Sequence, residues 1–318
     1  MPLKQRRFRG ARGLAGAKDP VLAPPGPGVH DAAAPWHSKL LMPLTPYRQA
    51  MEPERLEDSG LIPPLPGLAP APHGLTAGGR FEVRVTRHPD DIAAAQGLRY
   101  RVFYQEMQAM PTPAMVASGR DFDQFDHLCD HLLVLDHDRA PGDRVVGTYR
   151  LLRQAIALRH GGFYSATEYD LAPLLALRGG SLLELGRSCV HADYRTNATI
   201  QLLWRGIASY MIGHGTTHMF GCASFAGTDP ALHAMPLSYL HHHHRSPPGL
   251  AVSALPERRQ PMDLLACEQV SLRAAMRAMP PLVKAYLRLG AYIGDGAVVL
   301  FAVAIVAPAT SATAVAAI

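Results

Sequence analysis

A strict alternation of apolar and polar residues first appears in the segment FEVRVT, residues 81 to 86. Its period of two predicts a β-strand with one apolar face. A helix with an acidic first turn is predicted from Pro89 towards Met107, because proline and aspartate both favour the start of a helix. The proline-bearing stretch from Pro111 to Gly119 predicts a loop.

Two further strand-like runs, residues 131 to 136 and 144 to 152, flank a Pro-Gly turn and predict a β-hairpin. A third apolar run, residues 182 to 190, contains two charged residues and leads through a short polar loop into an amphipathic helix at residues 197 to 213. A further strand is expected at residues 218 to 225. The folded region therefore mixes strands and helices along one chain.

The third run carries Glu184 and Arg187, which would point to opposite faces of a regular strand. A β-bulge at Gly186 would bring both to one side and leave one backbone N–H unpaired. Such a donor suits the oxyanion that forms when a thioester is attacked, and the Glu184 carboxylate could accept a proton. The alternative is a structural ion pair that closes the end of the strand.

The helix after this strand begins near Thr196 or Asn197, and its first backbone N–H groups have no partner within the helix. Helix starts of this kind hold phosphate groups. The predicted phosphate-binding residues are Thr196, Asn197, Ala198, Thr199 and Ile200. Arg150 points where its apolar strand neighbours point, so it needs an anionic partner, and Asp123, Asp126 and Glu184 are the candidates.

Composition divides the chain of 318 residues into three parts. Of the 28 prolines, 14 lie in residues 1 to 79, which are expected to be a disordered Pro/Gly/Ala-rich leader. Residues 80 to 299 are expected to form one domain, since a hydrophobic content of 48% supplies a sizeable core. Residues 300 to 318 form an atypical Ala/Val-rich tail.

The net charge of +5 favours an acidic protein or a lipid surface as partner, and no nucleic-acid-binding motif accompanies it. Four cysteines without C-x-x-C spacing indicate neither a zinc site nor a disulfide framework. Cys189 is better interpreted as a buried thiol than as a nucleophile. His241 to His244 lack spaced partners, so no metal site is predicted. No secretory signal follows the basic first residues, and a cytoplasmic protein is expected.

Several motifs in fixed order resemble one known family. The order of hairpin, charged strand, polar loop, helix and strand resembles the Gcn5-related N-acetyltransferase (GNAT) fold. The motifs within it resemble those of the bacterial L-ornithine N-alpha-acyltransferases of ornithine-lipid synthesis over about residues 81 to 299. The motifs are LRYRVFYQEM, DFDQFD, VVGTYRLL, ELGRSCVHADYR, IQLLWRGI, FGCASFAGTDP and AYIGDGAV.

The resemblance implies an α+β fold of GNAT type with a central mixed, mostly antiparallel sheet flanked by helices. It also implies transfer of a 3-hydroxyacyl group from acyl carrier protein to the α-amino group of L-ornithine, giving lyso-ornithine lipid. The 4'-phosphopantetheine thioester would be a co-substrate, and no bound cofactor is expected. Peripheral contact with the inner face of the membrane is left open. The implied catalytic residues are Glu184, Arg187 and Arg150, and the implied substrate-binding residues are Asp123, Asp126, Arg99 and Phe103.

The same charged positions also resemble those of acyl-homoserine-lactone synthases, which remain an alternative, and a membrane-active, hemolysin-like protein is a third. Two departures from the family pattern stand out. Asn197 occupies a position where the phosphate loop of the fold carries glycine. The family pattern stops at Val299, and the tail after it is a membrane-seeking segment, a replacement strand or a frame-shifted terminus, of which the last is favoured.

Overall fold

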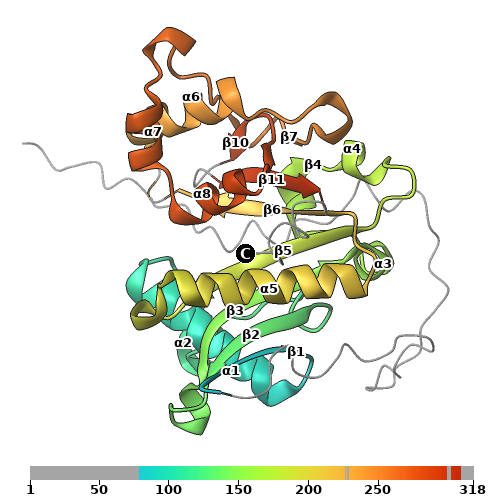
Figure 1. Cartoon of the computed structure of the whole chain (residues 1–318), viewed down its shortest axis with the longest axis vertical. Helices are drawn as coiled ribbons and strands as arrows, with labels where there is room; N and C mark the ends of the chain where they lie inside the picture. The colour runs from blue at the N-terminus through green and yellow to red at the C-terminus, as the bar shows by residue number, and fades with distance from the viewer. Residues whose placement is uncertain (1–78, 226, 228, 299–301, 309–318) are drawn as a thin grey trace, which may run out of the picture. The chain divides into compact units, whose positions relative to one another are not determined.

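The computed structural model describes residues 79–225, 227, 229–298 and 302–308, which are coloured in Figure 1. The predicted leader, apart from Gly79, and residues 300, 301 and 309 to 318 of the predicted tail lie outside the described residues. The strands are β1 (Phe81–Thr86), β2 (Asp130–Asp136), β3 (Val145–Arg153), β4 (Tyr169–Asp170), β5 (Leu182–Val190), β6 (His218–Ser224), β7 (Ser253–Ala254), β8 (Arg259–Gln260), β9 (Tyr292–Ile293), β10 (Ala297–Val298) and β11 (Ala302–Pro308).

The α-helices alternate with the strands along the chain. They are α1 (Pro89–Tyr100), α2 (Pro113–Ser118), α3 (Gln154–Arg159), α4 (Ala172–Leu175), α5 (Asn197–Gly213), α6 (Ala234–His243), α7 (Leu272–Ala278) and α8 (Pro281–Arg288). Two shorter helical segments matter for the site: the π-helix η1 (Arg101–Glu106), which continues α1, and the 3-10 helix η3 (Tyr164–Thr167).

The large sheet has the strand order β1-β2-β3-β5-β6-β11-β10-β8, with β9 beside β11. Its neighbouring strands are antiparallel, except that β5 and β6 are parallel. The sheet is therefore mixed and mostly antiparallel, as the resemblance implies. A separate two-stranded sheet joins β4 to β7.

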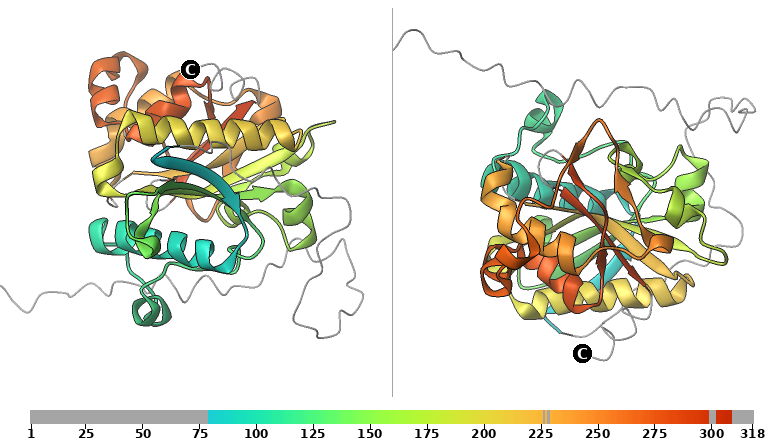
Figure 2. Two further views of the ribbon diagram at one scale, coloured as in Figure 1. Left: turned by 60° about the horizontal axis from the view of Figure 1, so that its bottom comes forward. Right: turned by 90° about the horizontal axis from the view of Figure 1, so that it is seen from above.

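Helices cover both faces of the sheet, and Figure 2 shows α1 and α5 on opposite sides of it. On one face Leu203 and Ile207 of α5 join the apolar cluster formed by β1, β2, β3 and β5. The close approach needs Gly206, since a Cβ there would lie 2.6 Å from a methyl carbon of Leu132. On the other face Leu98 of α1 packs in a cluster with Leu133.

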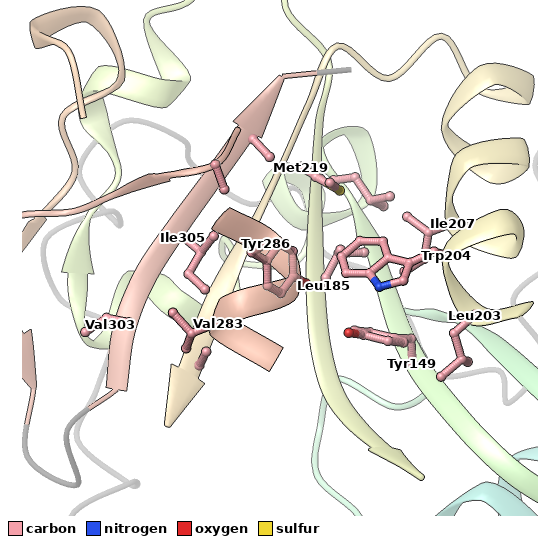
Figure 3. Packing of buried hydrophobic residues seen from close by; sticks show 14 of the residues in the cluster. Tyr149, Leu185, Leu203, Trp204, Ile207, Met219, Val283, Tyr286, Val303 and Ile305 are labelled. Atoms are coloured by element: carbon pink, nitrogen blue, oxygen red, sulfur yellow. The ribbon is translucent and has the colours of Figure 1, made fainter. Parts of the chain in front are cut away.

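Residues 302 to 308, within the segment expected as an atypical tail, form the inner strand β11. This strand pairs with β6 along its whole length. Val303 and Ile305 lie in the same buried cluster as Val283 and Tyr286 of α8, as Figure 3 shows. The described part of this segment thus has the form of a replacement strand.

Most predicted elements agree with the structure, because their apolar periods are long and uninterrupted. The predicted helix at residues 197 to 213 has the bounds of α5. The loop predicted from Pro111 to Gly119 is wrong, because it contains the helix α2. Thr112 caps that helix by accepting a hydrogen bond from the Met115 amide, and Pro113 occupies its first turn. The prolines that indicated a loop mark instead the start of a short helix.

Candidate active site

Strands β5 and β6 part in the middle of the sheet. Their parallel register ends at the pair Glu184 and Phe220. Beyond it, the rest of β5 to Val190 pairs with β3, and the rest of β6 to Ser224 pairs with β11. Two facing edges without shared ladder bonds can accept an extended substrate between them.

A β-bulge follows on β5, one residue later than the sequence indicated. Gly186 keeps a regular pairing with Arg150, and the register then shifts so that Arg187 and Ser188 together face Tyr149. Arg187 has a φ of 49°, a left-handed conformation that costs an L-residue about 1 kcal/mol. The predicted bulge therefore exists, but the prediction that glycine supplies its unusual backbone is wrong. Ion pairs to Asp121 and Asp123 hold Arg187 in place.

Three aspartates and three arginines form a connected cluster at this bulge. Arg150 donates to Asp123 at 2.6 Å and lies 3.6 Å from Asp126. Arg187 lies 3.3 Å from the second carboxylate oxygen of Asp123. Arg99 donates to Asp121 at 2.7 Å and to Asp126 at 2.8 Å. The structure thus brings together five predicted residues and adds Asp121, and it confirms that aspartates are the partners of Arg150.

Exposure divides the members of this cluster into two groups. The side chain of Arg99 is 1% exposed and that of Asp126 is 8% exposed, so both lie behind the surface of the site. The side chains of Asp123 and Arg187 are 20% and 26% exposed and can meet a ligand. Burial raises the pKa of Asp123, but the charges of Arg150 and Arg187 outweigh burial and lower that pKa to about 2.

Aromatic rings border the guanidinium groups of Arg187 and Arg150. The Arg187 guanidinium carbon lies 6.0 Å from the Phe103 ring centroid and 5.8 Å from that of Tyr164. Arg150 lies 5.7 Å from the centroid of Tyr164 and 5.6 Å from that of Phe125. The structure therefore places Phe103 in the site wall, and it adds Tyr164, which no sequence motif singled out.

Glu184 is buried beside this wall, with an exposed fraction of 4%. Its carboxylate accepts hydrogen bonds from the backbone N–H of Tyr164 at 2.9 Å and of Ser165 at 2.7 Å. The Ser165 hydroxyl donates a third at 2.5 Å. Burial raises the pKa of Glu184, although these hydrogen bonds and the charge of Arg150 oppose the rise. The partners of Glu184 are thus in η3, and the alternative of an ion pair between Glu184 and Arg187 does not describe the contacts of either side chain.

The Ser165 hydroxyl links Glu184 to the Cys222 thiol on β6. The Cys222 thiol of β6 donates to the Ser165 hydroxyl at 3.4 Å and lies near Glu168. Glu168 is partly exposed, and burial raises its pKa. Ser165 and Glu168 have no sequence signal, because both lie in a short segment without a regular period.

The start of α5 offers fewer free amides than the sequence indicated. The Thr196 N–H donates to the Tyr194 carbonyl, and the Thr199 N–H donates to the Thr196 hydroxyl. The Ile200 N–H donates to the Thr196 carbonyl. Asn197 and Ala198 are exposed, and first-turn amides at their positions have no acceptor within a helix. Two of the five predicted residues therefore present donors suited to an anion.

A groove of about 250 Å³ continues from this helix start along α5 and α8. One wall contains Gln201 and Arg205, and the other contains Arg288 and Leu289. Trp204 forms the apolar base of the groove. Its ring packs edge-to-face on that of Tyr286, with the two ring centroids 4.9 Å apart. Figure 3 shows the two side chains next to each other. A groove with an apolar base and two exposed arginines at its rim fits a ligand that combines an apolar arm with a negative charge.

The remaining candidates lie apart from this chemistry. Cys189 is buried, and burial raises the pKa of its thiol to about 12, which suppresses the reactive thiolate. Across the described residues, no group of three or more His, Cys, Asp and Glu side chains is arranged to hold a metal ion. None of the helices in the described part of the chain has the length and apolarity needed to cross a membrane.

Comparisons with known proteins agree on one family. Residues 98 to 205 match the acetyltransferase (GNAT) domain family. The chain is 49% identical over 235 residues to the L-ornithine N(alpha)-acyltransferase of Rhizobium meliloti (strain 1021), a match that covers 73% of this chain and 79% of the relative. It is 50% identical over 225 residues to the L-ornithine N(alpha)-acyltransferase of Agrobacterium fabrum, covering 70% and 76%.

Among solved structures, the chain is similar to the N-acyl amino acid synthase FeeM from uncultured soil microbes. Its TM-score is 0.43 at 11% identity, and the match covers 74% of this chain and 94% of that chain. With relatives at half identity over most of its length, the chain belongs to the L-ornithine N(alpha)-acyltransferase family, and its central sheet is a GNAT-type acyltransferase fold.

Proposed function

We propose that the protein transfers a 3-hydroxyacyl group from acyl carrier protein to the α-amino group of L-ornithine, which gives lyso-ornithine lipid. The observation that carries the proposal is the identity of about half with relatives named for ornithine N-acylation. The site supports it with a partly exposed carboxylate and a partly exposed guanidinium side by side. Ornithine carries ammonium groups and a carboxylate that match this pair.

The acceptor is proposed to lie against Asp123 and Arg187. Asp123 keeps its negative charge over the whole physiological range, because its pKa is near 2, so it can hold an ammonium group. Arg187 presents a planar fork that suits a carboxylate. Arg150, Arg99 and Asp126 would order these two side chains from behind, and Phe103 would border the aliphatic stem.

The donor is proposed to enter from α5. The Asn197 and Ala198 amides would receive the phosphate of the 4'-phosphopantetheine arm, with Arg205 and Arg288 at the rim of the adjoining groove. From there the arm would run between the parting edges of β5 and β6 towards the bulge. A backbone N–H at the bulge would then stabilise the oxyanion at the thioester carbon.

In the reaction, the amine nitrogen forms a bond to the thioester carbon, and the carbon–sulfur bond breaks to leave a thiolate on the carrier arm, which becomes the free thiol by taking up the proton that the amine loses. The amine must lose a proton. Glu184 is proposed as the base that accepts it, acting through the Ser165 hydroxyl, which already donates to the carboxylate at 2.5 Å. The raised pKa of Glu184 makes the carboxylate a better proton acceptor.

The decisive experiment supplies the purified full chain with 3-hydroxyacyl carrier protein and either L-ornithine or S-adenosylmethionine, and identifies the products by mass spectrometry. We expect an α-N-acyl amide of ornithine and free carrier thiol in equal amounts. A homoserine lactone formed from S-adenosylmethionine would instead establish the alternative acyltransferase. Transfer from acyl-coenzyme A but not from carrier protein would overturn the donor assignment alone.

A further inference from the structure

The segment of residues 107 to 119 presents an apolar surface without charge. It contains no Lys, Arg, Asp or Glu over thirteen consecutive positions. Three large side chains on it are mostly exposed: Met107 is 61% exposed, Met110 63% and Val116 57%. Large exposed apolar side chains gathered on one short segment indicate a contact surface rather than ordinary solvent exposure.

This segment is attached to the site wall at both ends. Its backbone is held where the Ala109 N–H donates to the Phe103 carbonyl at 3.0 Å. The Tyr104 hydroxyl lies 3.3 Å from the Met115 sulfur and donates to Asp121 at 2.8 Å. Figure 2 shows α2, which the segment contains, standing out from the layers of the sheet. An apolar projection thus starts beside the proposed acceptor subsite.

We propose that the 107–119 segment docks on the headgroup and acyl boundary of an anionic lipid bilayer. Apolar side chains without charged neighbours enter this boundary readily. The exposed Arg120 directly follows the segment and complements anionic headgroups, whereas Glu106, which directly precedes it, is paired with Arg195. An acidic carrier protein fits this surface less well, because the segment itself offers no basic side chain.

The position of the 107–119 segment beside the site suggests a role for membrane docking in product release, and this role rests on the proposed function. The product would be an amide with one long acyl chain and a charged head, which is an amphiphile. Because Phe103 lies between the acceptor subsite and the segment, a docked segment would place the exit for the product at the bilayer surface.

The test measures co-sedimentation of the substrate-free full chain with vesicles of phosphatidylcholine alone or mixed with phosphatidylglycerol. The test variant carries Met107→Ser, Met110→Ser and Val116→Ser. The matched control carries Ile212→Ser, Leu232→Ser and Leu272→Ser, whose side chains are 63%, 72% and 59% exposed elsewhere on the chain. We expect the test variant to bind anionic vesicles about tenfold more weakly than the wild type and the control to stay within about twofold.

A second measurement uses Met110→Cys combined with Cys267→Ser, which removes the exposed native thiol, and labels position 110 with an environment-sensitive dye, whose emission should shift to the blue on anionic vesicles. An unchanged emission, or equal sedimentation of the test variant and wild type, would overturn the proposal. So would loss of carrier-protein binding by the test variant with unchanged vesicle binding. Acyl transfer without vesicles separates this question from the proposed function, because the test variant should keep its rate within about twofold.

Discussion

The Ser165 hydroxyl donates a hydrogen bond of 2.5 Å to the Glu184 carboxylate, which also accepts the Ser165 backbone N–H at 2.7 Å. One carboxylate on the sheet thereby fixes the short helix that presents Tyr164 to the site. The same contact gives a buried acid a hydroxyl through which it can exchange a proton. Positioning and proton transfer therefore depend on the same pair of residues.

Glu184→Gln should remove the base and keep most of the positioning, because the amide oxygen of glutamine can still accept both Ser165 donors and only the Tyr164 N–H loses its acceptor. We expect kcat to fall by about 10² to 10⁴ with the fold retained in circular dichroism. In the wild type, kcat should rise with pH as Glu184 loses its proton, at a pH above the usual range for glutamate because burial raises its pKa. Near-normal transfer by Glu184→Gln across the pH range would rule out the base assignment. Ser165→Ala keeps the carboxylate and should lower kcat if the proton passes through the hydroxyl.

Asp123 should contribute stability that depends on pH. Its pKa is about 2 in the folded protein against 3.8 ordinarily, so its stabilisation is complete above pH 4 and is lost as the pH falls through the folded pKa. The difference corresponds to about 2 kcal/mol. Denaturant unfolding without substrate should show Asp123→Asn less stable by about that amount at pH 7. The gap between the two proteins should narrow from pH 4 to pH 2, and a constant gap would contradict the assignment.

Arg187 has a left-handed backbone conformation and a charged side chain. Two substitutions separate the effect of the backbone on stability from the effect of the charge on substrate binding. Arg187→Gly and Arg187→Ala both remove the guanidinium and should both raise the KM for ornithine at least about tenfold. Glycine adopts the φ of 49° without strain, so Arg187→Gly should be about 1 kcal/mol more stable than Arg187→Ala. Equal stability would mean that the bulge relaxes once the side chain is lost.

Arg288 lies at the rim of the groove between α5 and α8. Arg288→Glu should raise the KM for acyl carrier protein about tenfold, since reversing a charge at the rim opposes an acidic donor, and should leave kcat nearly unchanged. Arg178→Glu reverses an exposed charge outside the groove and is the matched control. Steady-state kinetics at low and high salt test this, because the difference should shrink as salt screens the charges. An equal effect of both variants would point to net charge alone.

The sequence predicted those parts of the fold and site that repeat or pair in a regular way. Long apolar periods identified β1, β2, β3, β5, β6 and α5. The requirement of a buried Arg150 for an anion identified Asp123. The presence of a bulge in β5 was predictable, since Glu184 and Arg187 otherwise point to opposite faces. Its exact position was not. Tertiary ion pairs, rather than the freedom of Gly186, decide which residue adopts the strained backbone.

The parts that the sequence did not predict depend on contacts distant in the chain. Ser165 has no local signal, because its partner Glu184 lies 19 positions away. Because the Thr196 hydroxyl accepts the Thr199 N–H, one amide that the sequence predicted to be free is not available to a ligand. The tail at residues 302 to 308 departs from the family's residue pattern, yet its small and β-branched side chains suit an inner strand. The structure shows that residues 302 to 308 form an inner strand through their pairing with β6.

The most direct test of that strand is a cavity made within it. Ile305 is 2% exposed and packs in the main cluster of the sheet, so Ile305→Ala should lower the free energy of unfolding by about 2 to 5 kcal/mol. Ile212 is 63% exposed, and Ile212→Ala should change it by no more than about 0.5 kcal/mol. Denaturant titrations of both variants with the wild type make the comparison. If Ile305→Ala were as stable as Ile212→Ala, residues 302 to 308 would not belong to the folded sheet in solution, and the wall behind β6 would have to be formed by other residues.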